Sequence, residues 1–101
     1  MRMRAKLLAG AAIIASALTA TAAWADTTYP PEGGIWNHGV SQGYTYSDYW
    51  HDADCHGSTA VGVSTVRSPN MNPGSWSRAK VASSSFGNAA YYRIEAGGSC
   101  P

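Results

Sequence analysis

The chain has 101 residues, a formal net charge of +1 at pH 7, and charged residues at only 13% of its positions. This low charge excludes the broad basic surface that a nucleic-acid partner requires. A chain of this length holds one small domain, whose hydrophobic core usually needs a disulfide or a second subunit to support it.

The first 25 residues have the pattern of a secretory signal peptide. Residues 2–6 carry three basic side chains, and residues 7–23 are uncharged and rich in alanine, isoleucine and leucine. Ala23 and Ala25 then place small side chains at the two positions that a signal peptidase reads, which predicts cleavage after Ala25. A retained membrane anchor is the alternative, because the uncharged run is nearly long enough to span a bilayer. We expect a secreted, extracellular protein.

Cleavage would leave 76 residues (101 − 25) with four basic and six acidic side chains, a net charge of −2 (4 − 6). We expect residues 26–32, which contain two prolines, to form a flexible N-terminal arm, and residues 33–101 to form one domain. In an oxidising compartment Cys55 and Cys100 predict a disulfide that stabilises the domain by about 4 kcal/mol. Two free thiols or an intermolecular bridge are the alternatives.

The domain is predicted to consist of short strands separated by turns. The first strand alternates, with Trp36, His38 and Val40 on one face, and the second is rich in tyrosine and threonine. The expected strands are residues 35–40, 44–50, 58–66, 75–82 and 89–95. No segment has sustained helical periodicity. The sequence therefore predicts an all-β fold, a small antiparallel sandwich or barrel.

The stretch Tyr44–Ser58 holds the densest set of chemically versatile side chains, with four aromatics, two histidines, three aspartates and one cysteine. A metal site around His51 and His56 is one interpretation, but the ligand spacing matches no recurring zinc site. A calcium loop is another, but Val63 stands where that loop needs a bidentate glutamate. Solvated loop residues, with both histidines bonded to the backbone, are the simpler interpretation, so we expect no metal.

The sequence offers little support for catalysis. No strand-to-helix nucleophile elbow is predicted, because no segment has helical periodicity, and a cysteine in a disulfide cannot act as a nucleophile. We therefore expect no enzymatic activity and no cofactor. The ten aromatic residues of the predicted mature chain are the more unusual feature, because a core of this size cannot hide them all. The excess predicts an exposed aromatic surface of the kind that binds proteins, glycans or the membrane interface.

Several motifs, in order, resemble the lactococcin 972 family of bacteriocins. They are Glu32-Gly33-Gly34-x-Trp36-x-His38-Gly39, Tyr46-Ser47-Asp48-Tyr49-x-His51 with His56, Pro73-Gly74-Ser75-Trp76-Ser77-Arg78-Ala79-Lys80-Val81, and Ala90-Tyr91-Tyr92. The resemblance implies a secreted antibacterial polypeptide, folded as a β-sandwich over residues 33–101 and active as a homodimer. It further implies binding to the cell-wall precursor lipid II, a block of septum formation in related Gram-positive bacteria, and a dedicated export and immunity transporter. The two cysteines and the non-aromatic residues 93–98 depart from the family's pattern.

Within this resemblance, the candidate ligand-binding residues are tryptophans, histidines and basic side chains. Arg78 and Lys80, with Arg67 as a third candidate, are the expected partners of the precursor's pyrophosphate. The tryptophans are expected against sugar rings or at the lipid interface. The full candidate set is Trp36, His38, Trp50, His51, His56, Trp76, Arg78 and Lys80. A secreted signalling or adhesion module without killing activity is the alternative function.

Overall fold

The computed structural model describes residues 23–97 and Cys100. Its strands are β1 (Trp24–Thr28), β2 (Ile35–Ser41), β3 (Tyr44–Trp50), β4 (His56–Val61), β5 (Thr65–Arg67), β6 (Trp76–Ala82) and β7 (Ala89–Ile94). The described residues contain no helix long and apolar enough to span a membrane.

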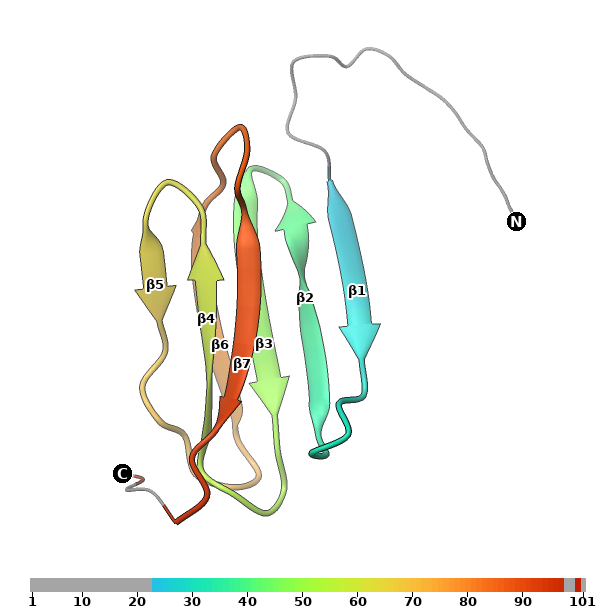
Figure 1. The fold of residues 1–101 in the computed structure, drawn as a ribbon, viewed down its shortest axis with the longest axis vertical. Helices are drawn as coiled ribbons and strands as arrows, with labels where there is room; N and C mark the ends of the chain where they lie inside the picture. Colours follow the sequence, from blue (N-terminus) through green and yellow to red (C-terminus); the bar gives the residue numbers. More distant parts are fainter. Residues whose placement is uncertain (1–22, 98–99, 101) are drawn as a thin grey trace, which may run out of the picture.

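The strands form two antiparallel sheets that pack face to face (Figure 1). One sheet has the order β1-β2-β3-β6 and the other the order β5-β4-β7. Strands β4 and β7 lie over β3 and β6, while β1 extends beyond the smaller sheet. The predicted all-β sandwich of short antiparallel strands is therefore confirmed.

The single strand expected over residues 58–66 is instead a hairpin. Strand β4 starts earlier, at His56, and the chain turns at residues 62–64 before β5. Gly62 approaches the neighbouring strand so closely that an added Cβ would lie 2.1 Å from the carbonyl oxygen of Ala82. Its N–H also donates to the carbonyl oxygen of Ser64 over 2.8 Å, which closes the turn.

Strand β1 covers the last residues of the predicted signal peptide and the first residues of the predicted flexible arm. Trp24–Thr28 pairs antiparallel with β2, from Trp24 opposite Val40 to Thr28 opposite Trp36. Threonine favours strands, and the hydroxyl of Thr28 bonds the Nε2 atom of His38 at 3.1 Å. Residues 26–28 thus lie in a strand rather than in a flexible arm, and this strand also spans the bond after Ala25.

The core between the sheets is built from small and polar side chains. Its apolar centre consists of Ala60, Ala79 and Val81, with Val66 packed against them. Buried serines are satisfied by hydrogen bonds, as in the 2.8 Å contact between the hydroxyls of Ser58 and Ser77. The hydrogen bonds of these serines fix how the two sheets face one another, and the buried hydroxyl of Thr45 is left without a partner among the residues that the structure describes.

Tyr49 is the largest fully buried side chain and ties the strands to the chain before β2. Its hydroxyl donates to the carbonyl oxygen of Gly33 over 2.6 Å. Burial, aided by the neighbouring Tyr92, raises the pKa of Tyr49 to about 12. Gly34 must be a glycine, because it has a φ of +92° and an added Cβ would lie 2.2 Å from the carbonyl oxygen of Trp50.

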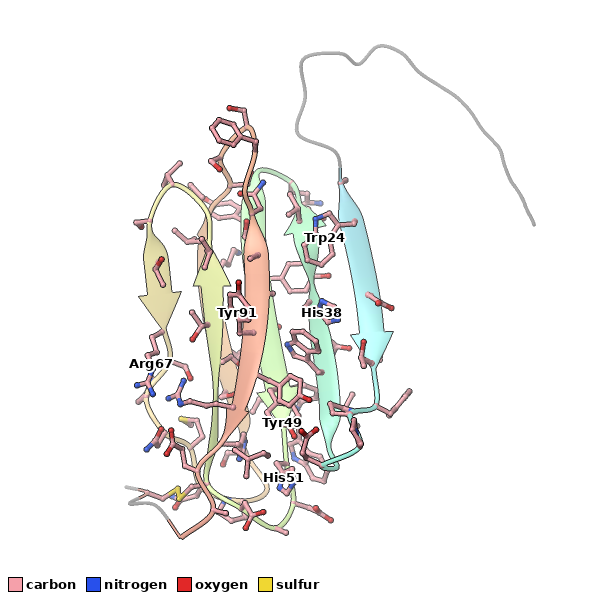
Figure 2. The ribbon with its side chains drawn as sticks, viewed as in Figure 1. Trp24, His38, Tyr49, His51, Arg67 and Tyr91 are labelled. Carbon is pink, nitrogen blue, oxygen red and sulfur yellow. A yellow bond between two sulfur atoms is a disulfide. The ribbon has the colours of Figure 1, made fainter. Side chains whose placement is uncertain are left out.

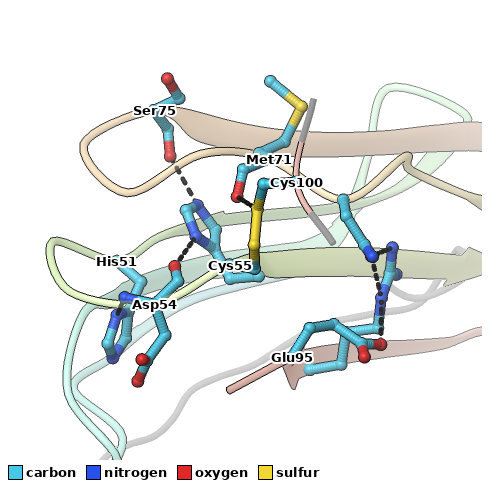
Figure 3. The surroundings of a disulfide bond; sticks show 10 residues. His51, Asp54, Cys55, Met71, Ser75, Glu95 and Cys100 are labelled. Carbon is cyan, nitrogen blue, oxygen red and sulfur yellow. Dashed lines mark hydrogen bonds and ion pairs between the residues drawn. A yellow bond between two sulfur atoms is a disulfide. The ribbon is translucent and has the colours of Figure 1, made fainter. Parts of the chain in front are cut away.

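A disulfide joins Cys55, just before β4, to Cys100 in the C-terminal tail (Figure 3). The two Cα atoms are 5.8 Å apart and the residues are 45 positions apart in the sequence. This confirms the intramolecular pairing among the alternatives that the sequence left open. The bridge fastens the tail to the loops at one end of the sandwich.

Candidate binding face

Strands β3 and β6 present alternate side chains to solvent on the side of the four-stranded sheet that faces away from β5-β4-β7. Thr45, Ser47 and Tyr49 of β3 point inward and are fully buried. In β6 the inward positions are Ser77, Ala79 and Val81. The residues between them form a surface that we call the outer face: Tyr44, Tyr46, Asp48, Trp50, Trp76, Arg78 and Lys80.

The register of the two strands places these outward residues in opposite pairs. Tyr46 lies opposite Lys80, Asp48 opposite Arg78, and Trp50 opposite Trp76. Side chains directly opposite in an antiparallel pair are near enough to interact. Each basic residue therefore has an aromatic or acidic neighbour across the sheet.

Aromatic rings hold both basic groups in place. The Nζ atom of Lys80 lies 4.5 Å from the centre of the Tyr44 ring, and the guanidinium carbon of Arg78 lies 5.1 Å from the centre of the Trp76 ring. Cation–π contacts of this kind hold a charge in place while leaving its hydrogen-bond donors available. The two cations are thus positioned before any ligand arrives.

Asp48 competes for one side of Arg78. Its Oδ2 atom lies 3.1 Å from Nη1 of Arg78, whose side chain is 62% exposed. Such an exposed pair contributes little to stability. Burial raises the pKa of Asp48 above its ordinary value, and the attraction of Arg78 offsets that rise only in part. The remaining guanidinium donors of Arg78 face solvent and can bind an anion.

Two neighbouring hollows lie on this surface. The first, of about 490 Å³, contains both basic residues and is lined by Ser41, Gln42, Tyr44, Tyr46, Asp48, Arg78 and Lys80. The second, of about 520 Å³, has no basic side chain and is lined by Ala25, Asp26, Thr27, Asn37, Tyr46 and Asp48. Because Tyr46 and Asp48 line both, a ligand can extend from a cationic region into one that offers only neutral and acidic groups.

Trp36 and His38 lie on the opposite face of the same sheet, and Figure 2 shows His38 there. Their rings stack with centres 3.6 Å apart, and the indole N–H of Trp36 donates to the hydroxyl of Ser47 over 2.9 Å. Burial lowers the pKa of His38, and the carboxylate of Asp26, 3.9 Å away, opposes this in part. These two candidates are therefore separate from the outer face.

His51, in the loop after β3, and His56, the first residue of β4, are both buried. Figure 3 shows His51 near the disulfide. The Nδ1 atom of His51 accepts the N–H groups of Ala53 and Asp54, and its Nε2 donates to a backbone carbonyl 3.0 Å away. The ring nitrogens of His56 lie 2.8 Å and 2.6 Å from the carbonyl oxygens of Asp54 and Ser75. Both histidine rings therefore hold loop backbone in place through hydrogen bonds. Among the residues that the structure describes, no three His, Cys, Asp or Glu side chains group around a space for a metal ion.

Arg67 lies in the other sheet, on β5, and forms an ion pair with Glu95 at 3.6 Å (Figure 2). It is therefore not a neighbour of Arg78 and Lys80. Sequence reasoning missed Tyr44, Tyr46 and Asp48 as members of the same surface. Their alternation was visible in the sequence, but the pairing of β3 with β6 was not, because 25 residues separate the two strands.

Comparisons with known proteins identify one family. Residues 32–92 match the model of the family described as Bacteriocin (Lactococcin_972). No curated protein and no solved structure gives a match. The matched segment runs from the turn before β2 into β7 and so includes both strands of the outer face.

Proposed function

Because this chain belongs to the lactococcin 972 family of bacteriocins, we propose that it stops growth of related Gram-positive bacteria by binding lipid II through its outer face. Occupation of the precursor would block septum and wall synthesis. The mechanism needs no catalytic residue and no cofactor. The chain would act after export as an extracellular protein, as a homodimer, with a dedicated transporter for export and immunity.

One observation carries the proposal: Arg78 and Lys80 are held by aromatic rings beside an open hollow. A pyrophosphate is a compact anion that a guanidinium and an ammonium can bind by charge-assisted hydrogen bonds. Trp50 and Trp76 at the far end of the same surface offer flat apolar faces to sugar rings. The neighbouring hollow, lined by Thr27 and Asn37, offers neutral hydrogen-bonding groups for the uncharged parts of the ligand.

The test compares binding of the exported protein to vesicles with and without lipid II. We expect saturable binding that depends on lipid II and exceeds any binding to the plain vesicles. Equal binding to both would exclude this mechanism and favour a signalling or adhesion module.

The double variant Arg78→Gln with Lys80→Gln should abolish the lipid II-dependent part while the urea unfolding midpoint stays nearly constant, because both side chains are exposed. Arg67→Gln is the matched control, since it removes an exposed basic group from the other sheet. Undiminished binding by the folded double variant would exclude the proposed role of these residues.

A further inference from the structure

Three turns meet at one end of the sandwich, and each exposes a large apolar or aromatic side chain. They join β2 to β3, β4 to β5, and β6 to β7, and all lie at the top of Figure 1. Phe86 in the last turn is 83% exposed, Val63 in the second is 66% exposed, and Tyr44, directly after the first, is 44% exposed. We call this set of turns the apolar end.

Backbone hydrogen bonds tie the three turns into one platform. The N–H of Val63 donates to the carbonyl oxygen of Ala82 over 2.9 Å, and the N–H of Ser83 donates to the carbonyl oxygen of Gly43 over 2.9 Å. The second of these bonds joins the β6–β7 turn to the β2–β3 turn, and the first joins the β4–β5 turn to the end of β6. The exposed side chains are therefore carried on a connected surface.

The longest of the turns, residues 83–88, is organised from within. The Asn88 side chain accepts the N–H of Ser84 over 2.8 Å and donates to its carbonyl oxygen over 2.9 Å, while the Ser84 hydroxyl donates to the carbonyl oxygen of Phe86. Gly87 adopts a φ of +77°, which lets the chain reverse beyond the phenylalanine. The turn thus satisfies its own polar groups and leaves the only phenylalanine of the chain in solvent.

Charge is distributed so that this end carries no acid. The three turns contain no Asp or Glu, and the closest basic side chain is Lys80, which contacts Tyr44. Four of the six acids lie around the opposite end of the sandwich, namely Glu32, Asp52, Asp54 and Glu95, and the other two, Asp26 and Asp48, lie within strands. An apolar tip beside a cation, with the acids remote, is complementary to a bilayer that contains anionic lipids.

We propose that the apolar end docks on a phospholipid bilayer, with Phe86 and Val63 entering the interfacial region. Aromatic rings are favoured at this depth, and Tyr44 can place its hydroxyl at the level of the headgroups. Lys80 then lies where it can contact lipid phosphates. This docking needs no lipid II, although it shares Tyr44 and Lys80 with the outer face. It does bring the first hollow, which Ser41 and Gln42 line at the same end, next to the membrane surface.

The test measures partition of the exported protein onto vesicles of phosphatidylglycerol and phosphatidylcholine that contain no lipid II. Phe86→Ser should weaken partition about tenfold, since one large apolar side chain no longer leaves water. Tyr29→Ser is the matched control, because Tyr29 is 72% exposed in the connection at the opposite end, and it should change partition by less than about twofold. Lys80→Gln should reduce the preference for the anionic lipid, and an unchanged preference would contradict the proposed contact of Lys80 with lipid phosphates.

A failure of the parent protein to bind these vesicles would overturn the proposal, as would equal losses in the Phe86→Ser and Tyr29→Ser variants. Depth is measured with Phe86→Trp and Tyr29→Trp and brominated lipids, and the added fluorescence should be quenched only in the first. Because lipid II is absent from all these vesicles, their outcome is separate from the lipid II-dependent binding that tests the proposed function.

Discussion

The aromatic and acidic stretch after Gly43 divides into two regions of opposite character. In β3, Tyr46 and Asp48 point to solvent and line an open hollow. Beyond β3, His51 in the following loop and His56 at the start of β4 are buried, and each uses both ring nitrogens in hydrogen bonds to the protein. The histidines, which look reactive in the sequence, therefore support the structure, while ordinary basic and aromatic residues form the surface that is free to bind.

The strongest test of this division breaks the disulfide at the end where the histidines lie. Replacing Cys55 and Cys100 together by serine should lower the free energy of unfolding by about 4 kcal/mol, because the unfolded chain regains the entropy of a long open loop. Urea unfolding measures the loss, and reduction of the unsubstituted protein should reproduce it. Where the variant remains folded, its lipid II-dependent binding should be unchanged. A large loss of binding by the folded variant would contradict the separation of the two regions.

The next largest effect concerns His56. Substitution by alanine leaves the carbonyl oxygens of Asp54 and Ser75 without their buried partner and opens a cavity, so the free energy of unfolding should fall by about 3 kcal/mol. Asp52→Ala in the loop before β4 is the control, since Asp52 is exposed and should change stability by about 0.5 kcal/mol or less. If His56→Ala instead kept its stability and lost binding, the histidine would belong to the binding site.

A pair of tryptophan variants compares the two faces of the four-stranded sheet directly. Trp36→Phe removes the hydrogen bond to Ser47 and should cost about 1 kcal/mol of stability without affecting binding. Trp76→Phe keeps an aromatic ring on the outer face but weakens the contact with Arg78, so it should leave stability nearly unchanged and weaken binding several-fold. Denaturation and vesicle binding on the same samples would check both, and a reversed pattern would mean that the inner face binds the ligand.

The strands could be predicted from the sequence more completely than the binding face could. Alternation in Tyr44–Trp50 and Trp76–Ala82 was enough to predict two strands, but not which of their faces is exposed. Which strands become neighbours depends on packing between distant segments, so the meeting of Asp48 with Arg78 could not be read from local pattern. For the same reason the eight candidates could not be separated into four on the outer face, two on the inner face and two at the ends of the β3–β4 loop.

Strand β1 shows a different limit of local reasoning. In the sequence, residues 24–28 look like the junction between a cleaved signal peptide and a flexible arm. They form a strand because the edge of β2 supplies their hydrogen-bonding partners. The break at Gly62 was missed because it depends on the approach of Ala82 from a strand twenty residues away. In both places tertiary pairing overrode the local signal.

The smallest expected effect is on Asp48, and it tests how the outer face holds its charges. Because burial raises its pKa in the folded state, the folded protein binds the proton more tightly than the unfolded chain does. Ionisation of Asp48 therefore destabilises the folded protein. The contribution of Asp48 to the free energy of unfolding is fully present at low pH and is lost as the pH rises through its raised pKa. Asp48→Asn should be more stable than the parent at pH 7 by about 0.5 kcal/mol or less, and the difference should vanish at about pH 3 and below, where the carboxyl is protonated in both states. Urea midpoints at pH 7 and pH 3 would show this difference in stability. The same variant should also bind lipid II vesicles more tightly, because Arg78 no longer faces a competing carboxylate. A variant less stable than the parent at pH 7 would mean that the ion pair with Arg78 outweighs the burial of Asp48, and that the outer face is held together by its charges.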